Sequence, residues 1–105
     1  MIRGDVYRLK RPKGVGHEQH GERYGVVVQS DALMNRSTIL MAPTSRSAMP
    51  SSFRPEVSVR GETTRVLVEQ VGPSDLTRIG QRVGHLAVDE MWTVDEALAA
   101  VLGLR

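Results

Sequence analysis

The sequence predicts a mainly β fold that closes with one C-terminal helix. Short apolar runs with strand-like alternation recur along the chain, and residues that favour turns separate them. A helical spacing of apolar residues marks the C-terminal segment. Because one short helix covers little of a sheet, we expect a small, strongly curved antiparallel sheet that curls on itself or pairs with a second copy.

The strands are expected where apolar or β-branched residues cluster between turn signals. Residues 5–9 alternate, since Val6 and Arg8 face opposite to Tyr7 and Leu9. The valine run at 26–28 predicts a buried strand. The remaining expected elements are a helical turn within 31–36, a strand over 37–42 that Pro43 ends, strands over 56–59 and 64–71, a turn over 72–75, and a last strand over 78–83.

The C-terminal helix is predicted by apolar residues at helical spacing, which are Met91, Val94, Leu98, Val101 and Leu102. Two positions are candidates for the start of this helix. Asp89 and Glu90 suit the first turn, where the helix dipole favours negative charge, whereas the sequence T-V-D-E at 93–96 fits a capping box and a shorter helix. Gly103 is expected to end it.

Length and composition place the chain among small globular proteins. Its 105 residues predict a single domain over 1–105. The chain contains no cysteine, which suits a reducing cytoplasm and leaves neither disulfides nor thiolate metal sites. No apolar run approaches the roughly 18 residues of a membrane span, so we expect no membrane partner.

The net charge of +2 is unevenly distributed. Residues 1–84 carry 13 basic and 8 acidic side chains, whereas 85–105 carry Arg105 against four acidic residues. The resulting balances of +5 and −3 are consistent with a polyanionic partner for the body of the domain, and equally with an ordinary solvated surface.

Two long loops, 10–22 and 44–54, follow the first and third expected strands and hold the candidate chemistry. Cleavage of RNA without a metal needs a base for the 2′-hydroxyl and a cation for the charge on phosphorus. Glu18 is a candidate base, Arg23 is a candidate phosphate-binding cation, and the Thr44 hydroxyl can fix a phosphate oxygen. These residue types are common, so their presence alone is weak support.

The histidines suggest a rival chemistry. The sequence H-E-Q-H at 17–20 is one residue short of the H-E-x-x-H zinc motif, and it lies in a glycine-rich loop instead of a helix. His17 and His20 are therefore expected to be solvated, or at most an acid–base pair, with no metal or other cofactor, and His85 is expected to be structural. Trp92 is expected in the core or an interface, and Tyr24 and Phe53 are expected to pack the ends of the sheet instead of stacking on bases.

Several segments, in order and over nearly the whole length, are similar to one known family. They are R-G-D-V-Y at 3–7, G-H-E-Q-H-G-E-R at 16–23, V-V-V-Q-S at 26–30, Asn35, A-P-T-S at 42–45, V-L-V-E-Q-V at 66–71, D-L at 75–76, R-I-G at 78–80 and the closing A-L to L-G-L over 97–104. In their shared order and spacing, these segments resemble the MazF/PemK toxins.

The resemblance implies a small SH3-like barrel that forms a homodimer and serves as the toxin of a toxin–antitoxin pair. It implies a metal-independent, sequence-selective endoribonuclease that cuts single-stranded RNA and leaves a 2′,3′-cyclic phosphate and a 5′-hydroxyl. The family's arginine falls on Arg23, its threonine on Thr44, and a glutamate that some members use on Glu18. The antitoxin is expected to carry an acidic tail. Residues expected to bind RNA are Lys10, Arg11, Lys13, Gln19, Ser45 and Arg46.

The chain departs from the family pattern at two places. Tyr24-Gly25 stands where a proline usually follows the arginine, so Arg23 has a less restrained backbone. Arg8-Leu9-Lys10 replaces a common acidic residue, which makes the loop more basic. Two other functions stay open: a toxin of the same fold that poisons a protein target such as gyrase, and a non-catalytic SH3-like binding module.

Overall fold

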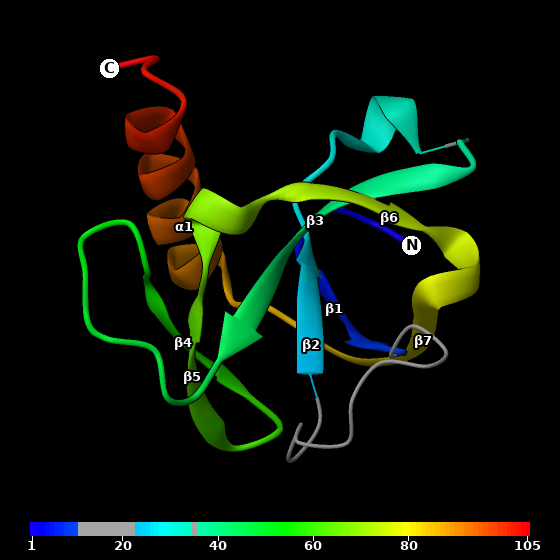
Figure 1. Cartoon of the computed structure of the whole chain (residues 1–105), viewed down its shortest axis with the longest axis horizontal. Coiled ribbons are helices and arrows are strands. Elements are labelled where there is room, and N and C mark those ends of the chain that lie inside the picture. The colour runs from blue at the N-terminus through cyan, green and yellow to red at the C-terminus, as the bar shows by residue number, and fades with distance from the viewer. Residues whose placement is uncertain (11–22, 35) are drawn as a thin grey trace.

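The computed structural model describes residues 1–10, 23–34 and 36–105, and it confirms the expected mainly β fold with a C-terminal helix (Figure 1). The strands are β1 (Asp5–Leu9), β2 (Arg23–Val27), β3 (Thr38–Ser45), β4 (Glu56–Val59), β5 (Glu62–Val66), β6 (Gly72–Asp75) and β7 (Ile79–His85). Short 3₁₀ turns are η1 (Asp31–Leu33), η2 (Val68–Gln70) and η3 (Leu76–Arg78), and the helix is α1 (Val88–Val101).

The strands form one antiparallel sheet in the order β4-β5-β3-β2-β1-β7, with β6 beside β3. β3 is the central strand. Its residue Met41 pairs with Val27 of β2 on one edge and with Gly72 of β6 on the other. Further along, Thr44 pairs with Val66 of β5, so β6 and β5 follow one another along β3. The sheet curls around its inner face, and α1 lies against one side (Figure 1).

The segment 64–71, which the sequence predicts as one strand, is interrupted. β5 ends at Val66, η2 occupies the next turn, and the chain then rejoins β3 as β6. The interruption turns Val68 into the core, where it is fully buried and packs in the same cluster as Val94 and Ala97 of α1. Tertiary packing therefore overrides the strand propensity of this valine-rich stretch.

Two predictions that rested on proline are wrong. Pro43 does not end β3, because its carbonyl accepts a hydrogen bond from the Leu67 N–H at 2.8 Å and the strand continues to Ser45. The expected turn at 72–75 is the strand β6, and it contains Pro73. Among the described residues β6 pairs only with β3, and a strand at the margin of a sheet tolerates a missing N–H.

The helix α1 begins at the earlier of the two expected positions. The Glu90 carboxylate accepts a hydrogen bond from the Ala87 N–H at 2.9 Å, which satisfies a donor at the helix start. Thr93 lies inside the helix, so the alternative capping box is wrong. Gly103, at φ +72°, ends the helix in a left-handed turn as expected. Among the described segments, none is a helix of the length and apolar content that a membrane crossing requires.

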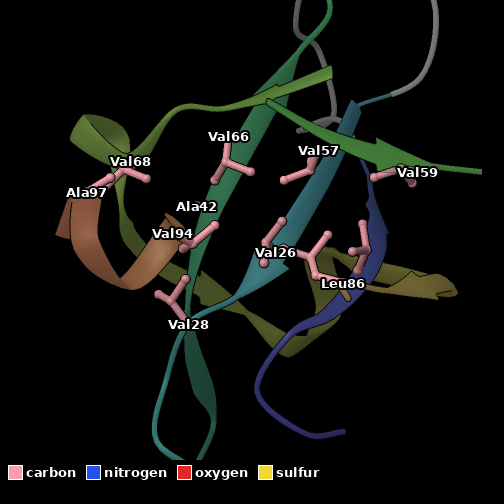
Figure 2. Packing of buried hydrophobic residues seen from close by; sticks show 11 residues of the cluster. Val26, Val28, Ala42, Val57, Val59, Val66, Val68, Leu86, Val94 and Ala97 are labelled. Atoms are coloured by element: carbon pink, nitrogen blue, oxygen red, sulfur yellow. The ribbon is translucent and has the colours of Figure 1, made fainter. Parts of the chain in front are cut away.

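The core follows the alternation of the strands. Val26 and Val28 face the inner side with Ala42, Val57 and other buried residues, which Figure 2 shows in one cluster. Val27 faces the other side, where it packs with Ile39 and Met41 against partly buried Tyr7 and Leu9. Both sides of β2 and β3 are therefore covered, and these two strands form the rigid centre that carries the neighbouring loops.

The N-terminal R-G-D segment joins both ends of the fold. Arg3 donates to the Val28 carbonyl at 2.8 Å and forms an ion pair with Asp95 of α1 at 2.7 Å. Gly4 has a φ of +95°, and a Cβ there would lie 3.0 Å from the His85 ring. Asp5 is buried and accepts hydrogen bonds from Arg82 and His85 of β7. His85 thus has the structural role expected for it.

Candidate active site

The inner face of the sheet changes from apolar to polar toward one end. Along β3, the buried Ala42 is followed two residues later by Thr44 and then by Arg46. Along β5, the buried Val66 is preceded two residues earlier by Thr64 and then by Glu62. Since alternate residues of a strand share a face, both strands present polar side chains beyond the same end of the apolar core.

These polar side chains surround a cavity of ≈ 200 Å³. Its described lining residues are Tyr24, Thr44, Ser45, Arg46, Val59, Glu62 and Thr64. They come from β2, from β3 and the residue after it, and from the β4–β5 hairpin, so residues distant in sequence meet at this end of the barrel. The cavity combines an aromatic ring, hydroxyl groups and a charged pair, which suits a ligand with both flat apolar and polar surfaces.

Thr44 lies within β3 opposite Val66, and not in the loop where the sequence placed it. Its residue is only 6% exposed, so the strand holds this hydroxyl at the cavity wall. The Ser45 hydroxyl lies 3.3 Å from that of Ser47 and accepts a hydrogen bond from the Ser47 N–H. The strand therefore fixes Thr44, and Ser45, the last residue of β3, contacts Ser47 in the loop that follows.

Arg46 and Glu62 form an ion pair across the cavity, with 2.9 Å between Nη1 and Oε2. Both side chains are 55% exposed, so water screens the attraction and the pair contributes little to stability. An incoming anion can therefore compete with the Glu62 carboxylate for the Arg46 guanidinium.

Arg23 is the first residue of β2, is exposed, and pairs with Leu9 of β1. Gly25 pairs with Pro43, so the start of β2 and the end of β3 lie at the same end of the sheet. Alternation sets the Arg23 Cβ on the face opposite to Tyr24. Arg23 is not among the described residues that line the cavity, although it lies in the same strand as Tyr24, one residue before it.

The remaining predicted site residues divide into two groups. Lys10 is exposed, and its N–H donates to the Arg78 carbonyl at 2.8 Å. Arg11, Lys13, Glu18 and Gln19 lie outside the described residues, as do His17 and His20. The structure therefore brings Thr44, Ser45 and Arg46 together and describes nothing of the candidate base.

Sequence reasoning missed Glu62 and Thr64 as parts of the site. The predicted strand started at Thr64 and included Val66, so the period of two already placed Thr64 on the face of a core valine. Tyr24 was expected to pack the end of the sheet, and it does pack against the core cluster. It also lines the cavity, and stacking of its ring on a base stays a prediction.

The segment that follows Thr44 and Ser45 is tied back to the core by Arg54. Its guanidinium donates two hydrogen bonds to Oε2 of Glu69, at 2.7 and 3.0 Å. These bonds lower the pKa of Glu69 below its ordinary value, against the opposing effect of burial. The Arg54 carbonyl in turn accepts from Arg65 at 2.9 Å. The end of this loop is thereby held close to β5, which forms a wall of the cavity.

Two other sequence expectations concern metals and aromatic residues. Within residues 1–10, 23–34 and 36–105, no three histidine, aspartate or glutamate side chains gather in a way that could hold a metal ion. Trp92 is 68% exposed, so its expected place in the core is wrong, whereas its role at an interface stays a prediction. Phe53 lies against Arg54, with 5.8 Å between the guanidinium carbon and the ring centre.

Comparison with known proteins identifies the family. Residues 2–102 match the sequence profile described as "PemK-like, MazF-like toxin of type II toxin-antitoxin system". The chain belongs to this toxin family. A curated relative from Mycobacterium tuberculosis (strain ATCC 25618 / H37Rv), named "Putative toxin Rv3098A/RVBD_3098A", is 44% identical over 99% of both chains.

Solved structures of the PemK/MazF-like family share the fold. An "Endoribonuclease in complex with its cognate antitoxin from Mycobacterial species" has a TM-score of 0.82 at 19% identity, over 100% of this chain and 97% of that one. A MazE–MazF complex from Deinococcus radiodurans has a TM-score of 0.82 at 21% identity, with the same coverage. At these identities the likeness concerns the fold, and it confirms the barrel type expected from the sequence.

The structure gives physical reasons for two PemK/MazF-like segments of this chain. R-G-D at 3–5 is an anchor, since its arginine reaches the end of β2, its glycine adopts a positive φ and its aspartate binds β7. A-P-T-S at 42–45 is the passage of β3 from the apolar core to the polar cavity.

Proposed function

We propose that this chain is the toxin of a toxin–antitoxin pair and that it cuts single-stranded RNA without a metal ion. The supporting observation is the buried Thr44 at the wall of a polar cavity, at the end of the sheet where Arg23 begins the neighbouring strand. The two positions that match the family's arginine and threonine thus lie at one end of the fold.

The proposed reaction is attack of a ribose 2′-hydroxyl on the adjacent phosphorus. A new bond forms between the 2′-oxygen and phosphorus, and the bond from phosphorus to the 5′-oxygen breaks. Glu18 accepts the 2′-hydroxyl proton and later releases it to solvent, and the departing 5′-oxygen takes one proton from solvent. The products are a 2′,3′-cyclic phosphate and a 5′-hydroxyl, so the proton and charge count closes without a redox partner.

Arg23 and Thr44 are assigned to the phosphate. The phosphorane carries more negative charge than the ground state, and a guanidinium stabilises it with a planar pair of donors that keep their charge. The Thr44 hydroxyl donates to a non-bridging oxygen. Since Arg23 is exposed at a strand end and Thr44 is fixed in β3, the proposal requires the arginine side chain to turn toward the threonine when RNA binds.

The bound RNA is proposed to run past the basic residues at this end of the sheet. Lys10, Arg11, Lys13 and Arg46 supply positive charge, while Gln19 and Ser45 supply neutral hydrogen-bonding groups. The charge balance of +5 over residues 1–84 is consistent with this path. RNA as the substrate also places the protein in the cytoplasm.

The deciding experiment is incubation of the purified protein with a long RNA in the presence of EDTA. Cuts at specific sites with cyclic-phosphate and 5′-hydroxyl ends support the proposal. Intact RNA together with inhibition of gyrase supports the alternative, a toxin of the same fold that poisons a protein target. If the protein neither cuts RNA nor inhibits gyrase, the non-catalytic binding module is supported.

We further propose a homodimer that an antitoxin inhibits. β4, β6 and β7 are margins of the sheet among the described residues, and the notable exposed apolar side chains include Trp92. Two of the similar structures are complexes of a toxin-like chain with an antitoxin. An acidic, disordered tail would cover the basic loops and exclude RNA. Light scattering at micromolar concentration tests the dimer, and co-expression with the product of the neighbouring reading frame tests the antitoxin.

A further inference from the structure

The Thr64 side chain is an uncompensated polar group in the cavity wall. Thr64 is 4% exposed, and its hydroxyl oxygen is buried. Among the residues that the structure describes, none forms a hydrogen bond with that hydroxyl. Because a buried hydroxyl without a partner costs stability, such a group in a cavity wall points to a ligand that completes it.

Thr64 is close enough to Thr44 to act on the same ligand. Thr44 pairs directly with Val66, and Thr64 lies two residues before Val66 on the same face of β5. The two threonines are therefore diagonal neighbours across adjacent strands, a separation that one small molecule or one nucleotide can bridge. The Thr64 hydroxyl oxygen is buried in this structure, so a turn of the side chain to another staggered rotamer would bring it to a ligand in the cavity.

The other walls of the cavity suit a nucleobase. The Tyr24 ring and the Val59 side chain offer apolar surface for a flat ring system. Thr64 and the Glu62 carboxylate offer hydrogen-bonding groups for a base edge, and Arg46 lies at the exposed side, where a phosphate would arrive. Single-stranded RNA is read in this way, by unstacked bases that enter pockets with polar edges.

We propose that this cavity binds one unpaired base of the RNA and that the Thr64 hydroxyl is a specificity-determining contact to the edge of that base. This inference rests on the proposed function and deepens it. The two threonines then have different roles. Thr44, which lies nearer the core on β3, acts on phosphate. Thr64, on the adjacent strand β5, selects the nucleotide beside the cut.

The test compares Thr64→Val with Thr63→Val. Both substitutions replace a hydroxyl by a methyl group in β5, but Thr63 is exposed and pairs with Ser58 on the outer side of the hairpin. Thr64→Val should fold and melt at the same temperature as the wild type or higher, because it removes an unpaired buried polar group. It should raise the KM for the preferred site on the order of tenfold, with kcat nearly unchanged, and should cut other sequences more readily.

Thr63→Val should match the wild type in stability and in its cleavage pattern, and Thr64→Ser should restore the preference because it keeps the hydroxyl. Identical cut sites and KM values for Thr64→Val and the wild type would overturn the inference. A clearly lower melting temperature for Thr64→Val would also overturn it, because the hydroxyl would then already have a partner within the protein.

A binding experiment separates this inference from the proposed reaction. Short 2′-fluoro oligonucleotides of varied sequence have no 2′-hydroxyl nucleophile, so they report base recognition without cleavage. If the wild type binds them selectively and Thr64→Val does not, the base pocket stands even where no RNA is cut. If the wild type shows no preference among them, the base pocket is wrong even where RNA is cut.

Discussion

The Nδ1 atom of His85 donates a hydrogen bond to Oδ1 of Asp5 at 2.9 Å, which joins the last strand of the sheet to the first. The same carboxylate oxygen accepts from Nε of Arg82 at 3.0 Å, and the second oxygen accepts from the Ile2 N–H at 2.9 Å. One buried carboxylate therefore organises the N-terminal segment and the end of β7.

Asp5→Ala should destabilise the fold by about 1–3 kcal/mol, because it leaves several donors without their acceptor. Urea unfolding at neutral pH measures the change. Asp89→Asn, on the exposed first turn of α1, is the control and should change stability by less than about 1 kcal/mol. Equal effects of the two substitutions would contradict the role of Asp5.

Stability should also fall in acid through Asp5. Burial alone would raise its pKa, but the hydrogen bonds from Ile2, His85 and Arg82 outweigh burial and hold the pKa below its ordinary value of 3.8. A carboxylate with a lowered folded pKa stabilises the protein above its unfolded pKa, and that contribution disappears as the pH falls through the folded pKa. The difference in unfolding free energy between wild type and Asp5→Asn should therefore shrink below about pH 4.

Gly4→Ala should cost about 1–2 kcal/mol for the positive φ alone, with a further cost from the approach to His85. Gly84→Ala is the matched control on β7, since a Cβ there meets no atom within 4 Å. Thermal unfolding of the two variants should differ clearly, and a Gly4→Ala protein as stable as Gly84→Ala would contradict the backbone argument.

Arg23→Ala should reduce RNA cleavage by a factor of hundreds, which corresponds to the roughly 3–4 kcal/mol that an electrostatic stabiliser of the transition state supplies. Arg23→Lys should restore little, since a point charge does not replace the planar donor pair. Arg36→Ala, an exposed residue after η1, is the control for loss of positive charge. Thr44→Ala should reduce cleavage less than Arg23→Ala does.

His17→Ala and His20→Ala should keep their cleavage activity, because the proposed reaction uses a carboxylate and an arginine. Mapping of RNA ends for each variant checks this expectation. Loss of cleavage in the histidine variants together with normal cleavage by Arg23→Ala would favour a two-histidine ribonuclease instead.

The sequence predicted most elements of the fold, but it misjudged those whose environment decides their shape. The alternation at 5–9 and the valine run at 26–28 correspond to β1 and to β2 with the residue after it, because burial on both faces rewards these residue types. The stretch around Val68 has a strand propensity similar to that of these two segments, yet the chain bends there because α1 packs on it. Nothing local in the sequence reports that long-range contact.

The site was predicted in part for the same reason. Thr44, Ser45 and Arg46 are adjacent in sequence, so they could be assigned together before their surroundings were known. Glu62 and Thr64 reach the cavity only through the pairing of β5 with β3, which is a long-range property of the sheet. The pairing register of two strands decides which of their side chains meet, and this register is known only from the folded structure.

The break at η2 makes the helix a brace for the cavity. β5, which carries Thr64, and β6 both pair with β3, and η2 connects them. The helix α1 packs directly against η2 at Val68. The wall that holds Thr64 is therefore supported, through η2, by the packing of Val68 against Val94 and Ala97 of α1.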